Sequence, residues 1–193
     1  MIYPDSMILK DALSKYFSDN GLPTDGGLQD KWARYKILGM TFLAFPNFDS
    51  RRAALVRHDF HHIVNDLDTS SLGEGLIAAW ELSTGCGRYW ISWCMEPQAL
   101  WFGILLAPRR TFQTFVKARQ DSNFFHLEFD QDRLMGSSVG EIRRQLLPSG
   151  SSAKTAFSDY FKFAGCALLG ILMVIVFTPI FLFFTVLGFF LKV

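Results

Sequence analysis

The strongest pattern along the chain is a mainly apolar run at residues 163–191, which contains no charged side chain. A helix needs about 20 apolar residues to cross a bilayer, so this run predicts a membrane segment. At about 1.5 Å of rise per residue, the run is longer than a hydrocarbon core of about 30 Å. Pro179 stands near its middle. Pro179 could produce a kink in one tilted transmembrane helix or form the tip of a re-entrant hairpin. We expect the single tilted helix.

Apolar residues also recur at helical spacing near the N-terminus. Residues 5–17 form a short amphipathic pattern that ends before Asn20-Gly21-Leu22-Pro23. Residues 28–45 predict a second helix, because one of its faces would carry large apolar side chains. These are Leu28, Trp32, Tyr35, Leu38 and Phe42.

Two further helices are predicted in the middle of the chain. Asp49 or Ser50 can cap the first of them. The polar stretch 66–71 favours the end of this helix and the start of another, because its side chains bond their own backbone. The second helix would stop at Gly85-Cys86-Gly87. A connection this short usually folds two helices back antiparallel, so we predict a helical hairpin.

Further helices are predicted before the apolar run, whereas residues 89–95 suit either a strand or a helix and residues 124–129 suit an extended segment. Pro97 favours a helix start, and an apolar stretch continues from there to Pro108. Residues 137–147 have a helical pattern. The aromatic residues between 90 and 115 suit either core packing or a wall for a lipid-like ligand.

These patterns predict an all-α fold with three parts. Residues 1–150 would form one helical domain, residues 151–162 a linker, and residues 163–191 the membrane segment. The chain shows no internal repeat.

Most of the histidines, with two carboxylates, are concentrated around the predicted hairpin. His58 and His62 stand one turn apart on one helix face, and Asp59 lies about 100° round from His58. Glu74 falls in the first turn of the second helix, where glycines on both sides of it would let the backbones approach closely. These four side chains predict one site for a divalent metal.

Two interpretations of these residues need no metal. Ser71-Leu72-Gly73-Glu74 fits a capping box, and a histidine pair at this spacing is often part of a packed core. However, the histidines lie beside the apolar stripe of their helix, and this stripe is expected to face the protein interior. Burying two imidazoles and a carboxylate without a cation or full hydrogen bonding costs several kcal/mol. The metal site is therefore favoured.

The ligand types limit the metal chemistry. Two imidazoles and two carboxylates without a thiolate exclude a cysteine-rich structural zinc site. Four ligands would hold zinc tetrahedrally, whereas three ligands would leave positions open for oxygen or water. The sequence favours neither zinc nor iron(II). Histidine-box desaturases, the phosphohydrolases named for their His-Asp doublet and ferritin-like di-iron proteins each need ligands that this chain lacks.

Charge and cysteine content exclude some classes of protein and indicate a location. The net charge is +1 and the sequence shows no basic stripe, so a nucleic-acid-binding protein is not indicated. The three cysteines demand no oxidising compartment. Four basic residues precede the apolar run, whereas Lys192 alone follows it, so we expect the main domain on the cytoplasmic side of a bacterial inner membrane. The four are Arg143, Arg144, Lys154 and Lys162.

The spacing His58-Asp59-x-x-His62, with Glu74 after eleven further residues, resembles the metal signature of the coenzyme Q biosynthesis protein four family. Leu105-Leu106-Ala107-Pro108-Arg109 is similar to the family's helix break. Further similar segments are Leu127-Glu128-Phe129 and Ile142-Arg143-Arg144-Gln145-Leu146-Leu147. The resemblance covers about residues 25–150, whereas the apolar run and the N-terminal part depart from the family's pattern.

The resemblance implies a helical, membrane-associated protein that takes part in ubiquinone biosynthesis. His58, Asp59, His62 and Glu74 would hold one divalent metal, zinc or iron(II). The implied reaction is metal-dependent oxidative decarboxylation and hydroxylation at carbon one of a polyprenylated hydroxybenzoate ring. The alternatives are a non-catalytic, lipid-binding scaffold that organises other quinone-biosynthesis proteins, and a hydroxylase of another prenyl lipid. The expected partners are a polyprenylated quinone precursor, the membrane and those proteins, and a homodimer stays open.

Overall fold

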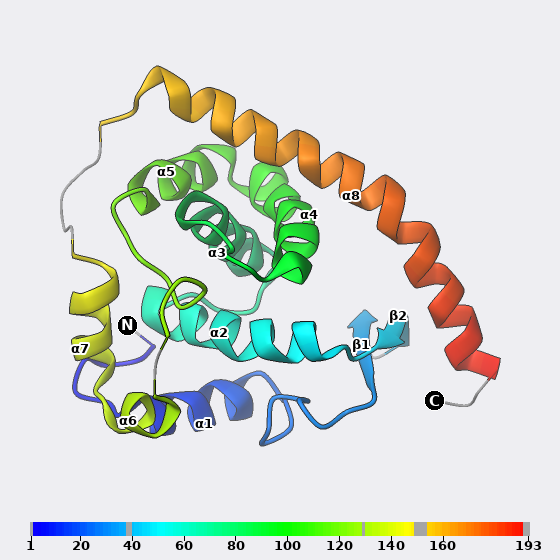
Figure 1. Cartoon of the computed structure of the whole chain (residues 1–193), viewed down its shortest axis with the longest axis horizontal. Helices are drawn as coiled ribbons and strands as arrows, with labels where there is room; N and C mark the ends of the chain where they lie inside the picture. Colours follow the sequence, from blue (N-terminus) through cyan, green and yellow to red (C-terminus); the bar gives the residue numbers. More distant parts are fainter. Residues whose placement is uncertain (1, 38–39, 129, 149–153, 191–193) are drawn as a thin grey trace.

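The computed structural model of this chain describes residues 2–37, 40–128, 130–148 and 154–190, and Figure 1 shows one long helix curved along the edge of a mainly helical domain. The elements in chain order are α1 (Leu9–Asp19), β1 (Trp32–Ile37), β2 (Met40–Pro46), α2 (Asp49–Asn65), α3 (Ser71–Thr84), α4 (Trp90–Leu106), α5 (Pro108–Ala118), α6 (Gln131–Gly136), α7 (Val139–Leu146) and α8 (Phe157–Phe190).

Helix α2 lies between two buried apolar clusters. The first cluster joins α2 to α1 and α7, and it includes Leu9, Phe60 and Ile142. The second cluster joins α3, α4 and α5, and it includes Leu100 and Phe115. Because both clusters border α2, the side chains on the face between them are shielded from bulk water.

The ends of α2 and α3 are set by short-range signals. Helix α2 begins at Asp49 after Phe48, which makes no side-chain cap, so the predicted cap at Asp49 or Ser50 is wrong by one or two residues. Asp66 ends α2 in the left-handed region, with φ of 56°. The Ser70 hydroxyl accepts a hydrogen bond from the Gly73 N–H and thereby caps α3.

Helix α3 packs mainly against α4 and α5 and touches α2 over a short stretch, so the two helices do not run side by side as the predicted hairpin requires. Its closest approach is to α4, where a Cβ on Gly75 would lie 2.1 Å from the backbone nitrogen of Gly103. Gly75, one of the two glycines beside Glu74, therefore allows α3 and α4 to pack closely. Helix α4 already begins at Trp90, so Pro97 lies inside the helix and the predicted start there is wrong.

The predicted helix over residues 28–45 is wrong. In the described part of this segment, β1 and β2 form an antiparallel two-stranded sheet with Trp32 opposite Pro46, and residues 38–39 lie outside the described residues. The reason lies far along the chain. The Ala44 N–H donates to Thr185 Oγ1 at 2.9 Å, and the Phe45 ring stacks on Phe181 with centroids 4.6 Å apart. The fold is therefore mainly helical, not all-α.

Helix α8 is continuous through Pro179, which excludes the re-entrant hairpin as an interpretation of the apolar run. It begins at Phe157, inside the predicted linker, while residues 149–153 and 191 lie outside the described residues. Residues Phe157–Leu187 form one helix long and apolar enough to cross a membrane, among the residues described, and its most apolar stretch of 18 residues has a mean hydropathy of 2.7.

Candidate metal centre

Three of the four predicted ligands come together where α2 meets the first turn of α3. The carboxylate oxygens of Glu74 lie 3.4 Å from His58 Nε2 and 3.5 Å from His62 Nε2. The two Nε2 atoms are 3.2 Å apart. One ligand atom from each of the three residues lies within 4.8 Å of the others. The helical spacing of the two histidines produces this convergence on the α2 side.

The other ring nitrogens of both histidines face hydrogen-bond acceptors. His58 Nδ1 lies 3.0 Å from Glu81 Oε1, and His62 Nδ1 lies 3.3 Å from the carbonyl oxygen of Leu67. We therefore infer that each Nδ1 carries a proton, so that each Nε2 presents a lone pair whenever its ring is neutral. Two lone pairs and a carboxylate then point at one small volume, an arrangement that suits a cation.

Glu74 does not form the capping box that its sequence position allows. The cap of α3 is Ser70, and the Glu74 carboxylate turns instead towards the two imidazoles. Burial would raise the pKa of Glu74, but the interactions with His58 and His62 outweigh it and lower this pKa. The Glu74 side chain is 32% exposed, so the group can be approached from solvent on this side.

Asp59 lies beside this group of three ligands and is not one of its members among the described residues. Its carboxyl is buried, hydrogen-bonds with Tyr16 and interacts electrostatically with His58 and His62. Burial raises the pKa of Asp59 to about 6, although both imidazoles and Tyr16 act in the opposite direction. The structure thus places Asp59 next to the predicted ligands, on the α1 side of them.

Sequence reasoning missed Glu81, which lies behind the histidines. Glu81 Oε1 accepts hydrogen bonds from the Nδ1 atoms of His58 and His61, the latter at 2.5 Å. His61 Nε2 in turn accepts the Phe124 N–H at 3.0 Å, so both of its ring nitrogens have partners. Glu81 stands seven residues after Glu74, two turns along the same face of α3, and this spacing could have identified it.

Glu96 is the second residue near His58 that sequence reasoning did not identify. It is the one charged residue in the sequence of α4, and it lies 3.8 Å from His58 Nδ1. Burial and the nearby Glu81 raise the pKa of Glu96. Burial would also raise the pKa of Glu81, but His58 and His61 outweigh it and lower this pKa. Burial opposes the charging of His58, yet Glu81 and Glu96 raise its pKa well above 6.5.

His58, Glu81 and Glu96 form a second group with ligand atoms within 4.8 Å of one another. This group would use Nδ1 of the same imidazole, and that nitrogen already donates its proton to Glu81. The His58 ring therefore joins the outer group of His58, His62 and Glu74 to the inner carboxylates of Glu81 and Glu96. The arrangement is that of a metal ligand oriented by a carboxylate behind it.

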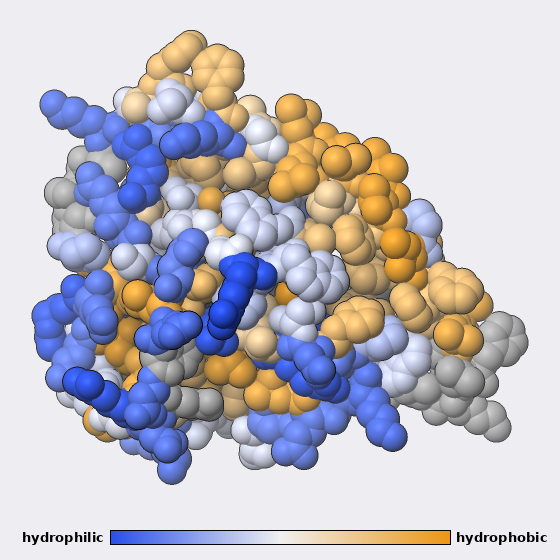
Figure 2. Space-filling view, in the orientation of Figure 1, coloured by the Kyte–Doolittle hydropathy of each residue, from blue (hydrophilic) through white to orange (hydrophobic). Residues whose placement is uncertain are grey.

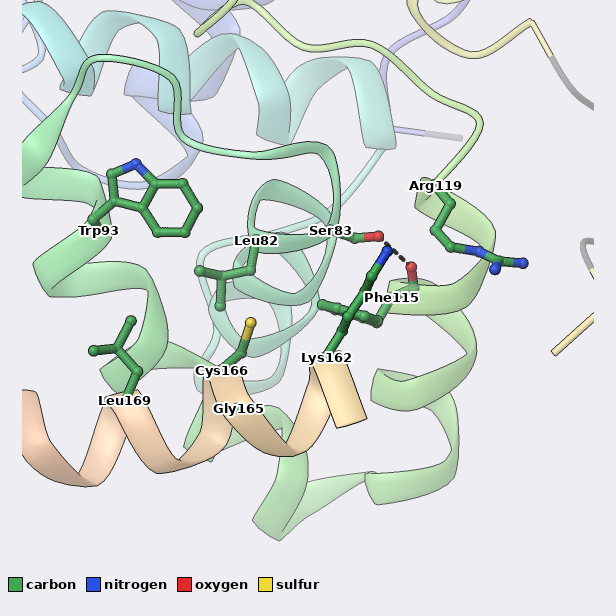
Figure 3. Close-up of a pocket in the computed structure, with 9 residues that line it drawn as sticks. All are labelled: Leu82, Ser83, Trp93, Phe115, Arg119, Lys162, Gly165, Cys166 and Leu169. Carbon is green, nitrogen blue, oxygen red and sulfur yellow. Dashed lines mark hydrogen bonds between the residues drawn. The ribbon is translucent and has the colours of Figure 1, made fainter. Parts of the chain in front are cut away.

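The larger of two described cavities, about 280 Å³, lies away from the histidines, between α3, α4, α5 and α8 (Figure 3). A smaller one of about 200 Å³ lies near His126. Comparison with protein families, curated proteins and solved structures finds no match. The geometry of the site is therefore the basis for a functional proposal.

Proposed function

We propose that this protein is a metal-dependent enzyme of prenyl-lipid metabolism that binds one divalent cation, zinc or iron(II), through His58, His62 and Glu74. The observation that carries the proposal is the convergence of two Nε2 atoms and a carboxylate within 4.8 Å. No lysine or arginine forms an ion pair with Glu74 among the described residues. A cation would satisfy all three groups at once.

The chain's own residues would prepare this site for chemistry. Glu81 and the Leu67 carbonyl hold the two imidazoles in the orientation that aims Nε2 at Glu74. Glu74 is partly exposed, so a substrate can approach from its side. Asp59 stands beside the ligands, where the family resemblance assigns it as a fourth. A cation with two histidines and one carboxylate supplies open coordination positions for oxygen or water.

The substrate that we propose is a polyprenylated hydroxybenzoate, with oxidative decarboxylation and hydroxylation at carbon one as the reaction. Dioxygen would be the oxidant and an external donor would supply two electrons, so that a hydroxyl replaces the carboxyl group and carbon dioxide and water are released. The resemblance described above supports this choice. The apolar helix α8 and the exposed apolar residues of α4 support a lipid-bound substrate, because a long prenyl tail partitions into such surroundings.

A non-catalytic scaffold is the second candidate. It is favoured by the position of the two cavities, neither of which is lined by His58, His62 or Glu74. In a scaffold the metal would be structural, and the protein would gather other quinone-biosynthesis proteins at the membrane.

The test is complementation of a strain that lacks this gene. Glu74→Gln removes the charge of a proposed ligand, and Glu128→Gln is the matched control on an exposed residue. We expect Glu74→Gln to lose quinone production and to accumulate a prenylated aromatic acid in lipid extracts, as measured by mass spectrometry. The control should restore quinone.

Normal quinone levels with Glu74→Gln would contradict the enzymatic proposal. Loss of quinone together with loss of partner proteins from the membrane fraction, without any turnover by the purified protein, would favour the scaffold.

A further inference from the structure

Helix α8 is attached to the domain along its length. Near its start, the buried Asp159 pairs with Arg119 at 2.9 Å. In its first half, the Trp101 Nε1–H donates to the carbonyl of Ala167 at 2.9 Å. Near its end, Thr185 accepts the Ala44 N–H. These contacts join α8 to α5, α4 and β2 in turn (Figure 1).

This attachment conflicts with a simple membrane span. At about 1.5 Å of rise per residue, the 34-residue helix is about 50 Å long. Strand β2 leads directly into the start of α2, where Asp49 and Arg52 form an exposed ion pair. If α8 crossed the bilayer with its contacts intact, it would carry these charges into or through the hydrocarbon. Charged groups are expensive there.

The outward side of α8 is apolar. Several of its exposed large apolar residues lie at spacings that place them on one face. Figure 2 shows hydrophobic residues gathered along the edge that α8 occupies, with hydrophilic residues over the opposite side of the molecule. These α8 residues are Leu168, Ile175, Phe183 and Val186.

Helix α4, beside α8, also presents no charge to its surroundings. Glu96 is its one charged residue, and that side chain is buried in the candidate metal centre. Leu105 is 74% exposed and Leu106 is 60% exposed, values that are unusual for large apolar residues at a water-facing surface. Trp90 and Phe102 are also exposed. We call these exposed residues the apolar face. Its members are Trp90, Phe102, Leu105 and Leu106 of α4 and Leu168, Ile175, Phe183 and Val186 of α8.

Basic residues border this face. Arg88 precedes α4, Arg109 and Arg110 follow it, and all three are exposed. Lys162 precedes the charge-free part of α8, and it lines the cavity of about 280 Å³ together with Arg119 (Figure 3). An apolar surface bordered by cations matches a bilayer that contains anionic headgroups. A second copy of the chain would present the same cations.

We propose that α4 and α8 lie flat in one leaflet of an anionic bilayer, with the apolar face in the acyl chains and the basic border at the headgroups. The protein is then held on one side of the membrane without crossing it. This arrangement keeps every contact between α8 and the domain. It is independent of the proposed metal chemistry, because no residue of the apolar face is a proposed ligand.

The first test is the sidedness of the two chain ends. The full chain, with different epitope tags at its N- and C-termini, is expressed in bacterial membranes. Sealed inside-out vesicles are then treated with a protease. We expect both tags to be cleaved to the same extent. Protection of one tag while the other is cleaved would show a crossing helix and overturn the proposal.

The second test measures the depth of α4. The native cysteines are replaced by alanine, single cysteines are placed by Leu105→Cys and Ile175→Cys, and Lys10→Cys on the exposed surface of α1 is the control. Each variant carries a nitrobenzoxadiazole label in vesicles of phosphatidylcholine and phosphatidylglycerol.

We expect blue-shifted emission and quenching by brominated lipids at positions 105 and 175, and neither at position 10. Quenching at 175 alone would show that α8 enters the bilayer without α4. No quenching at either position, with dimers in cross-linking, would show that a second copy covers the face. Both results contradict the proposal, and circular dichroism establishes that each variant is folded.

Discussion

His58 Nε2 and His62 Nε2 face each other at 3.2 Å, and the Glu74 carboxylate lies against both. The opposite nitrogens of the two rings face acceptors, so the short distance joins two lone pairs unless a cation or a proton lies between them.

Glu81 should control metal affinity without binding the metal itself. It accepts the hydrogen bond from His58 Nδ1 and so fixes the ring that presents Nε2. Carboxylates in this position contribute about 10–100-fold to metal affinity. We expect Glu81→Gln to weaken zinc binding by about that factor in a chelator competition titration. Glu128→Gln should bind zinc like the unaltered protein, and an unchanged affinity in Glu81→Gln would refute the role of Glu81.

Asp59 should make the metal-free protein less stable as the pH rises. Its pKa is raised from 3.8 to about 6, so the folded state binds more protons than the unfolded state between these values. The unfolding free energy therefore falls as the pH rises through this window, by about 2–3 kcal/mol for this group alone. Asp59→Asn removes the titration.

Chelator-treated Asp59→Asn should therefore be more stable than the unaltered protein at pH 7, and the difference should shrink towards pH 4. Urea unfolding in mild detergent at the two pH values measures it. A stability difference that does not change with pH would mean that the buried carboxyl does not titrate in this range.

Gly75 should tolerate no side chain. A Cβ at this position would lie 2.1 Å from the Gly103 nitrogen and 2.5 Å from its Cα, and both atoms belong to the backbone of α4. Overpacking of this kind costs about 1–3 kcal/mol, so Gly75→Ala should lower the unfolding free energy by at least that amount. Gly136→Ala is the control, because nothing lies within 4 Å of its added Cβ. Equal stability of the two variants would show that α3 and α4 are farther apart.

The outer part of the candidate site was predictable because its signals are local. One helical turn separates His58 from His62, and a polar break of a few residues brings the start of the next helix beside them. These relationships depend on helix geometry and capping. The sequence therefore indicates which of these side chains can meet, although α3 does not run antiparallel alongside α2 as the predicted hairpin requires.

The rest was not predictable because it depends on contacts between distant residues. Residues 32–37 and 40–46 form strands, β2 packs on α8, and the hydrogen bond between Ala44 and Thr185 spans 141 positions. Glu96 reaches His58 because Gly75 and Gly103 let α3 and α4 pack closely. Periodicity within one segment carries no information about either contact.

The metal content of the purified chain tests the central claim most directly. The full chain is purified in detergent without chelators, and bound metals are measured by inductively coupled plasma mass spectrometry. We expect about one zinc or iron per chain, and a loss of about tenfold or more in the double variant His58→Ala/His62→Ala, because two of the three proposed ligands are gone. Metal-free protein after reconstitution with either ion, or equal metal content in the double variant, would contradict the account.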